Sequence, residues 1–223
     1  MGKSLIIKGA DFSANGIAPD FEELKCIVAT SASQFIESPV AFTPRSRLVA
    51  EFAVSNLTNV GNIFGFSSNT TLYPEENFHF LTIVNPSYFS GSYGLLGYMN
   101  KKGAQALTTS VSDLAKHTLD VSTYALTAVS TDITISAETS TQNSVAFGIF
   151  GTSGYTSTAK DVLVGLKLYR VKLYSDYENA NSLVLDCIPV KRLADNKICL
   201  YDMVSGAFLM TNDGTNPNFE TLD

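Results

Sequence analysis

Apolar and polar residues alternate along much of this chain with a period of two. In the segment 47–54 every even position is apolar, and the charged residues Arg47 and Glu51 lie between them. Successive side chains of a β-strand point to opposite faces, so this period predicts a strand with one face in a core. Clusters of Gly, Asn, Ser and Pro separate further short β-rich runs. These runs occur at 63–66, 78–84, 117–123, 131–136, 144–150 and 162–174.

The run 162–174 is the longest, and its apolar positions change phase near Tyr169 and Arg170. Such a change predicts a β-bulge or a bend at that point. A single signal favours a helix: Asp20 precedes Phe21, and Glu23 stands where a capping box places an acid. This signal predicts one helical turn at most. Many short strands with turn residues between them predict an all-β sandwich or barrel.

Composition and charge narrow the class of partner. The chain has 223 residues, 45% hydrophobic and 16% charged, with a net charge of −6. Its bases are scattered, whereas a nucleic-acid-binding protein concentrates them on one face, so we expect no nucleic-acid partner. No apolar run approaches the length of a membrane span, so we expect no membrane partner. The short apolar run before Lys8 is too short for a signal peptide, which predicts synthesis in a cytoplasm.

The three cysteines, Cys26, Cys187 and Cys199, do not have metal-ligand spacing. Neither Cys187 nor Cys199 belongs to a CxxC pair or has a histidine nearby, so a zinc site lacks ligands. We therefore expect buried free thiols that behave as small apolar side chains. The loop acids that calcium would need are isolated from one another. We predict no metal and no cofactor.

Candidates for acid–base catalysis are few. Hydrolysis of a glycosidic bond needs two carboxylates held across the bond. The pairs Glu22–Glu23 and Glu75–Glu76 are adjacent in sequence, which suits solvated loop charge better than a shared catalytic face. The two histidines, His79 and His117, have no Cys, His or Asp at ligand spacing. We therefore predict that the protein is not an enzyme and has no catalytic residues.

One stretch, 85–98, has the composition of a binding surface. Tyr88, Phe89, Tyr93 and Tyr98 alternate there with small and hydroxyl-bearing residues. Flat rings beside hydroxyls and amides suit sugar recognition, and the same composition suits a protein contact. A structural alternative is that these rings fill the sandwich core. The loop around Tyr155 is a second, weaker candidate for ligand binding.

Motifs at both ends of the chain resemble those of one family. At the N-terminal end the motif is Gln34-Phe-Ile-Glu-Ser38 with the strand that follows it. At the C-terminal end the motifs are the segments 165–174, 185–192, 200–208 and 212–215. They are similar to the opening strands and the closing motifs of concanavalin A-like (laminin-G-like) jelly-roll domains. The segment Ser4–Asn15 is similar to the start of proteins from Bacteroides and their phages. The resemblance to the jelly-roll domains covers residues 24–219. It implies an all-β jelly-roll β-sandwich of the concanavalin A-like lectin/glucanase type, with antiparallel sheets over residues 21–223. Residues 1–20 are expected to form an N-terminal arm or an edge strand.

The same resemblance implies a scaffold role for residues 184–208. Asp186 and Pro189 are expected where a strand leaves the sheet. The charged residues that follow are expected in a solvated turn; they are Lys191, Arg192, Asp195 and Lys197. Tyr201 and Asp202 are expected to anchor the return strand, with Asp202 accepting backbone N–H bonds in the turn before Gly206.

Three functions agree with these features. The first is a non-enzymatic structural or adhesive protein of a phage particle: a fibre, decoration, tail-associated or capsid-associated module in the virion. Its partners would be other virion proteins or itself, as a symmetric homo-oligomer, with host surface glycans as ligands. The second is a glycan-binding protein of a gut bacterium, at the cell surface or secreted. The third is a degenerate glycosidase. This sandwich hosts several functions, so the resemblance alone does not choose among them.

Overall fold

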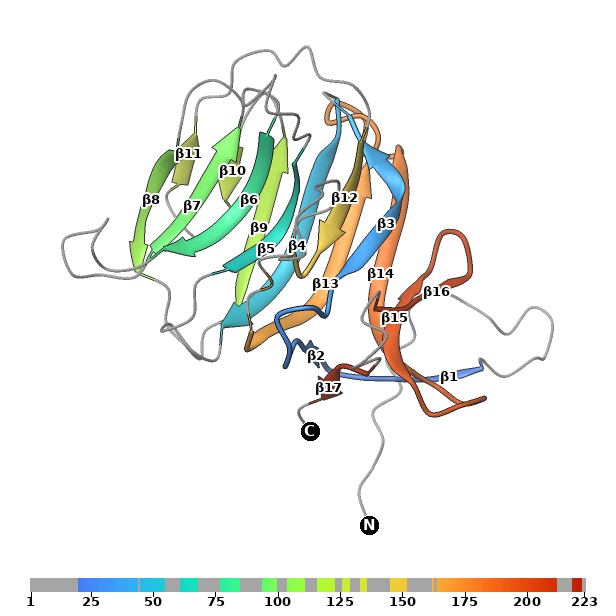
Figure 1. The fold of residues 1–223 in the computed structure, drawn as a ribbon. Helices are drawn as coiled ribbons and strands as arrows, with labels where there is room; N and C mark the ends of the chain where they lie inside the picture. Colours follow the sequence, from blue (N-terminus) through green and yellow to red (C-terminus); the bar gives the residue numbers. More distant parts are fainter. Residues whose placement is uncertain are drawn as a thin grey trace.

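A computed structural model places two antiparallel sheets against each other (Figure 1). The residues that it describes are 20–43, 45–54, 61–67, 77–84, 94–99, 104–110, 116–122, 126–128, 133–135, 145–151, 162, 164–211 and 218–221. All regular elements in these ranges are strands, and every pairing between them is antiparallel. No described segment forms a helix long and apolar enough to cross a membrane. The predicted all-β sandwich with antiparallel sheets is confirmed.

The larger sheet has eleven strands among the described residues. Its main path runs β11 (Ile133–Ile135), β10 (Leu126–Ala128), β9 (His117–Ser122), β4 (Arg47–Val54), β13 (Leu166–Tyr174), β14 (Leu183–Arg192), β15 (Ile198–Asp202) and β16 (Ala207–Leu209). Three short strands join it at its lower end in Figure 1: β1 (Phe21–Glu23), β2 (Ile27–Val28) and β17 (Glu220–Thr221). The smaller sheet runs β3 (Ile36–Phe42), β12 (Val145–Ile149), β5 (Gly61–Ser67), β6 (Asn77–Val84), β7 (Gly94–Met99) and β8 (Ala104–Ser110).

The core lies between the two sheets. The even-numbered apolar residues of β4 are buried in it, as the alternation in 47–54 predicts. The predicted phase change in β13 is a bulge: Leu168 pairs with Phe52 and Arg170 pairs with Glu51, so Tyr169 is an extra residue. After the bulge the inward positions become Val171 and Leu173, both fully buried. The bulge therefore turns Arg170 to the outer face of the larger sheet.

The predicted helical turn at Asp20–Glu23 is wrong. Residues 21–23 form β1, which pairs with residues 190–192 of β14. The capping signal is local and weak, whereas Phe21 gains a contact with Tyr201, with ring centroids 4.5 Å apart. This non-local packing outweighs the local preference.

The predicted position of Asp186 and Pro189 is also wrong, because both lie inside β14. After residue 187, β14 separates from β13, and residues 21–28 occupy the gap: β1 pairs with β14, and β2 pairs with β13. The Pro189 carbonyl accepts a hydrogen bond from Leu24 N on this side, at 2.9 Å. The N–H that proline lacks would face the same side, where one neighbouring strand gives way to another. Proline is tolerated at such a break in a ladder.

Candidate functional site

Of the five binding residues predicted from sequence, four lie outside the described residues. They are Tyr88, Phe89, Tyr93 and Tyr155. Tyr98 is placed for its backbone only, in β7, where it pairs with His79 and Ala104. Their role in ligand binding stays a prediction.

A different aromatic group lies on the outer face of the larger sheet. It comprises Phe21 of β1, Tyr201 of β15 and Phe208 of β16, and we name it the aromatic platform. The Tyr201 ring centroid lies 4.5 Å from that of Phe21 and 5.0 Å from that of Phe208, and the Phe21 and Phe208 centroids are 6.2 Å apart. All three side chains are half-buried. Met203 and Met210 pack beside them.

Strand register explains why these rings meet. Ile188 pairs with Tyr201, and Tyr201 pairs with Phe208, so the three side chains form one row across β14, β15 and β16. Their neighbours Cys187 and Leu200 point the other way, into the main core. Ile188, Val190 and Cys199 lie buried beneath the platform. The sheet is therefore apolar on both faces at this end.

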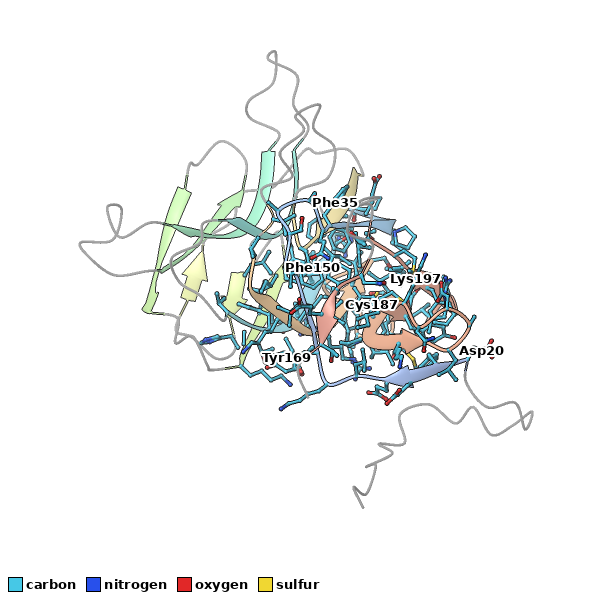
Figure 2. The ribbon with its side chains drawn as sticks, turned by 60° about the horizontal axis from the view of Figure 1, so that its bottom comes forward. Asp20, Phe35, Phe150, Tyr169, Cys187 and Lys197 are labelled. Atoms are coloured by element: carbon cyan, nitrogen blue, oxygen red, sulfur yellow. The ribbon has the colours of Figure 1, made fainter. Side chains whose placement is uncertain are left out.

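Polar groups border the platform. The Arg192 Cζ lies 5.5 Å from the Phe208 ring centroid. Arg192 donates to both oxygens of Asp195, at 2.9 and 2.5 Å, and Lys197 Nζ lies 3.8 Å from the same carboxylate. The Arg192 hydrogen bond lowers the pKa of Asp195 to about 2. The Tyr201 hydroxyl has no hydrogen-bond partner among the described residues. Figure 2 shows Lys197 at the same edge of the molecule as Asp20, whose carbonyl oxygen accepts from Leu193 N at 2.9 Å.

A second charged group, on β13 and β14, lies beside the platform. Arg170 donates to both oxygens of Asp186, at 2.8 and 2.7 Å, and Lys172 Nζ lies 3.9 Å from that carboxylate. The hydrogen bond that Arg170 donates to Asp186 raises the pKa of Arg170. Both oxygens of Asp186 therefore accept hydrogen bonds from one guanidinium, which fixes the carboxylate on the outer face of the sheet.

Asp202 performs the role predicted for it. Its carboxylate accepts hydrogen bonds from Val204 N at 3.1 Å and from Ser205 N at 3.2 Å, in the turn before Gly206. It also accepts from Ser205 Oγ at 2.5 Å and from Asp186 N at 2.9 Å. Gly206 has φ +74°, and a Cβ there would lie 3.5 Å from the Tyr201 hydroxyl oxygen. The carboxylate is structural, and it fixes the turn that joins Tyr201 to Phe208.

The cysteines are buried free thiols, as expected. Burial raises the pKa of Cys187 well above its usual value and raises that of Cys199 to about 11. A thiol with a raised pKa carries little of the reactive thiolate at neutral pH. No group of three potential metal ligands occurs in the described ranges.

Sequence reasoning missed the aromatic platform, although the sequence contains a signal for it. With a period of two, Cys199, Tyr201 and Met203 lie on one face and Leu200 lies on the other. In the next strand, Phe208 and Met210 lie on the face opposite to Leu209. Both faces of this hairpin are thus apolar, which a strand covered on one side does not need. The contribution of Phe21 had no such signal, because it depends on the pairing of β1 with β14.

Comparisons with known proteins bear on the fold. The chain matches no sequence model of a known protein family and no curated protein. It is similar to the crystal structure of a protein from Bacteroides ovatus ATCC 8483 that is provisionally classed as carbohydrate-binding. The TM-score is 0.54 and the identity 12%, over 91% of this chain and 61% of that protein. The chain thus spans less than two thirds of that protein's length.

A weaker likeness, with a TM-score of 0.42 and 13% identity, is to the enzymatically active domain of tailspike protein 2 of bacteriophage CBA120. It covers 83% of this chain and 35% of the phage chain. At these identities the Bacteroides ovatus structure supports the sandwich fold alone.

Proposed function

We propose that this protein binds carbohydrate and does not cleave it. The observation that carries the proposal is the aromatic platform, a group of half-buried rings bordered by paired charges on an outer sheet face. Rings of this kind pack on the apolar face of a pyranose, while nearby polar groups bind its hydroxyls. The buried carboxylates nearest the platform, Asp186 and Asp202, are held by an arginine and by a turn. This arrangement favours adhesion over acid–base chemistry.

We also propose that the sandwich is of the concanavalin A-like type. The resemblance of both chain ends to that family supports this. One of the resembling segments, Gln34–Ser38, has a clear structural role. The Gln34 side chain is fully buried; its Oε1 accepts from Thr30 N at 2.6 Å, and its Nε2 donates to the Asn218 carbonyl at 2.5 Å. It therefore ties the opening of the domain to its C-terminal segment.

The setting we propose is a phage particle, with the module assembled as a symmetric dimer or trimer and its binding face free. A glycan-binding protein at the surface of a gut bacterium is the alternative. Light scattering of the purified chain should give the mass of a dimer or trimer. A monomer at every concentration would count against the particle role and favour the bacterial one.

The proposed activity is tested by presenting the full chain to an array of bacterial and plant glycans. We expect binding to a limited set of them. Prolonged incubation of the bound glycans with the protein should release no new reducing ends, which a colorimetric assay detects. Release of reducing sugar would contradict the non-catalytic assignment. Absence of binding to every glycan would contradict the function itself.

A further inference from the structure

We propose that the aromatic platform is the sugar-binding site and that its ligand is a neutral pyranose with adjacent free hydroxyls. This inference rests on the proposed function and adds the site and the ligand class to it.

The rings supply the apolar part of such a site. They come from three strands, β1, β15 and β16, and they tilt against one another: the Phe21 and Tyr201 planes meet at 39°, and the Tyr201 and Phe208 planes at 58°. Each ring restrains its neighbours, and the methionines beside them adapt to the shape of a contact. Rigid rings with few rotatable bonds lose little conformational entropy when they contact a ligand.

The platform also offers polar groups at its border. The Tyr201 hydroxyl, which has no partner among the described residues, can donate and accept. Beside Phe208, Arg192 uses Nε and Nη2 for Asp195, and its Nη1 makes no hydrogen bond within the described part of the chain. An arginine and a carboxylate together present donors next to acceptors. Adjacent sugar hydroxyls, each both donor and acceptor, match such a pair.

The charges around the platform favour a neutral ligand. Charged side chains of both signs lie on this outer face and in the turns beside it, among them four bases and four acids. They are Arg170, Lys172, Arg192 and Lys197, and Asp20, Glu23, Asp186 and Asp195. Each of the four cations already has a carboxylate within 3.9 Å. An acidic sugar would have to compete with these carboxylates, in a protein whose net charge is −6. A neutral sugar has no such competition.

The test uses Tyr201→Phe, which keeps the ring packing and removes only the hydroxyl, and Tyr201→Ala, which also removes the ring. Tyr177→Phe is the matched control. Tyr177 is also half-buried, with the Arg45 Cζ 5.2 Å from its ring centroid and its hydroxyl 3.2 Å from Glu178 Oε1, but it lies in the β13–β14 turn. Amide NMR spectra of each full-length variant verify folding. Titration with methyl glycosides of glucose, galactose, mannose and N-acetylglucosamine, and with glucuronate and galacturonate, gives the affinities.

We expect one or more neutral glycosides to bind wild type and Tyr177→Phe equally. Tyr201→Phe should weaken binding about three- to tenfold, since one hydrogen bond is lost, and Tyr201→Ala should weaken it by more than about tenfold. The affinity should change little between low and high salt, because no net charge is neutralised.

Each contrary result has its own meaning. Wild-type binding that survives in Tyr201→Ala would refute the platform while leaving the proposed function intact. Preference for an acidic sugar, with affinity that falls as salt rises, would refute the neutral class. A self-association that Tyr201→Ala abolishes, with glycan binding unchanged, would show that a second copy occupies the platform. Failure of the wild type to bind any glycan on an array would refute the proposed function as well.

Discussion

Phe150→Ala is expected to lower the free energy of unfolding by about 3–5 kcal/mol, the range for deleting a buried phenyl ring. The Phe150 side chain is fully buried, and its ring stacks on Phe219 at a centroid distance of 4.7 Å. Its N–H donates to the Ile63 carbonyl at 2.8 Å, at the end of β12. The ring thereby packs the C-terminal segment onto the smaller sheet. Chemical denaturation monitored by circular dichroism measures the loss.

Phe150→Gly should cost about 1 kcal/mol less than Phe150→Ala, because Phe150 has φ 71°. Glycine adopts that left-handed conformation without a steric penalty, whereas alanine does not. The control is Phe52, equally buried but inside β4 and without a positive φ. There glycine should be less stable than alanine by about 0.5–1 kcal/mol. If the glycine and alanine variants had the same order of stability at positions 150 and 52, this account of the Phe150 backbone would be contradicted.

Much of the sandwich could be predicted from the sequence, because one-sided burial imposes a period of two. The run 47–54 showed this period, and all of it forms β4. The bulge at Tyr169 could also be predicted, since an extra residue shifts the phase of every apolar position after it. The turn role of Asp202 follows from its spacing to Gly206. These features depend on neighbours in the sequence.

The errors concern strands that depend on distant partners. β1 has three residues and exists because β14 extends beyond β13 and needs a neighbour. No local pattern in 20–23 contains that information, so a helical capping signal prevailed. From the sequence, Pro189 is expected at the end of a strand because it has no N–H to donate. It lies inside β14 because its neighbour on that side changes there from β13 to β1, which the sequence does not reveal.

The candidate site shows the same division. Composition directed attention to 85–98, where aromatic residues are close in sequence. The aromatic platform instead joins residues from positions 21, 201 and 208, and register alone brings them together. A site made of aromatic residues that are distant in sequence can be recognised only when the strand order is known. A single sequence does not contain the strand order.

Asp202→Ala is expected to lower the free energy of unfolding by about 2–3 kcal/mol. The substitution leaves the N–H groups of Asp186, Val204 and Ser205 without their carboxylate acceptor, and the donor of Asp186 is buried. Each unsatisfied buried donor costs about 1–3 kcal/mol. The N–H groups of Val204 and Ser205 lie in an exposed turn, where water can accept the hydrogen bonds that the carboxylate no longer accepts. Most of the expected loss therefore comes from the buried N–H of Asp186. Thermal and urea denaturation should agree on the loss.

Asp202→Asn separates the two carboxylate oxygens. Its amide oxygen can still serve Asp186 N and Val204 N, which both use Oδ1, but an NH₂ group then faces Ser205 N, which uses Oδ2. We expect about half the loss of the alanine variant. Asp195→Ala, which removes an exposed turn carboxylate that also pairs with an arginine, should cost much less than Asp202→Ala, because water screens an exposed ion pair. If Asp202→Ala and Asp195→Ala lower the free energy of unfolding equally, the buried hydrogen bonds of Asp202 do not hold the β15–β16 turn. They would then not support Tyr201 and Phe208 either.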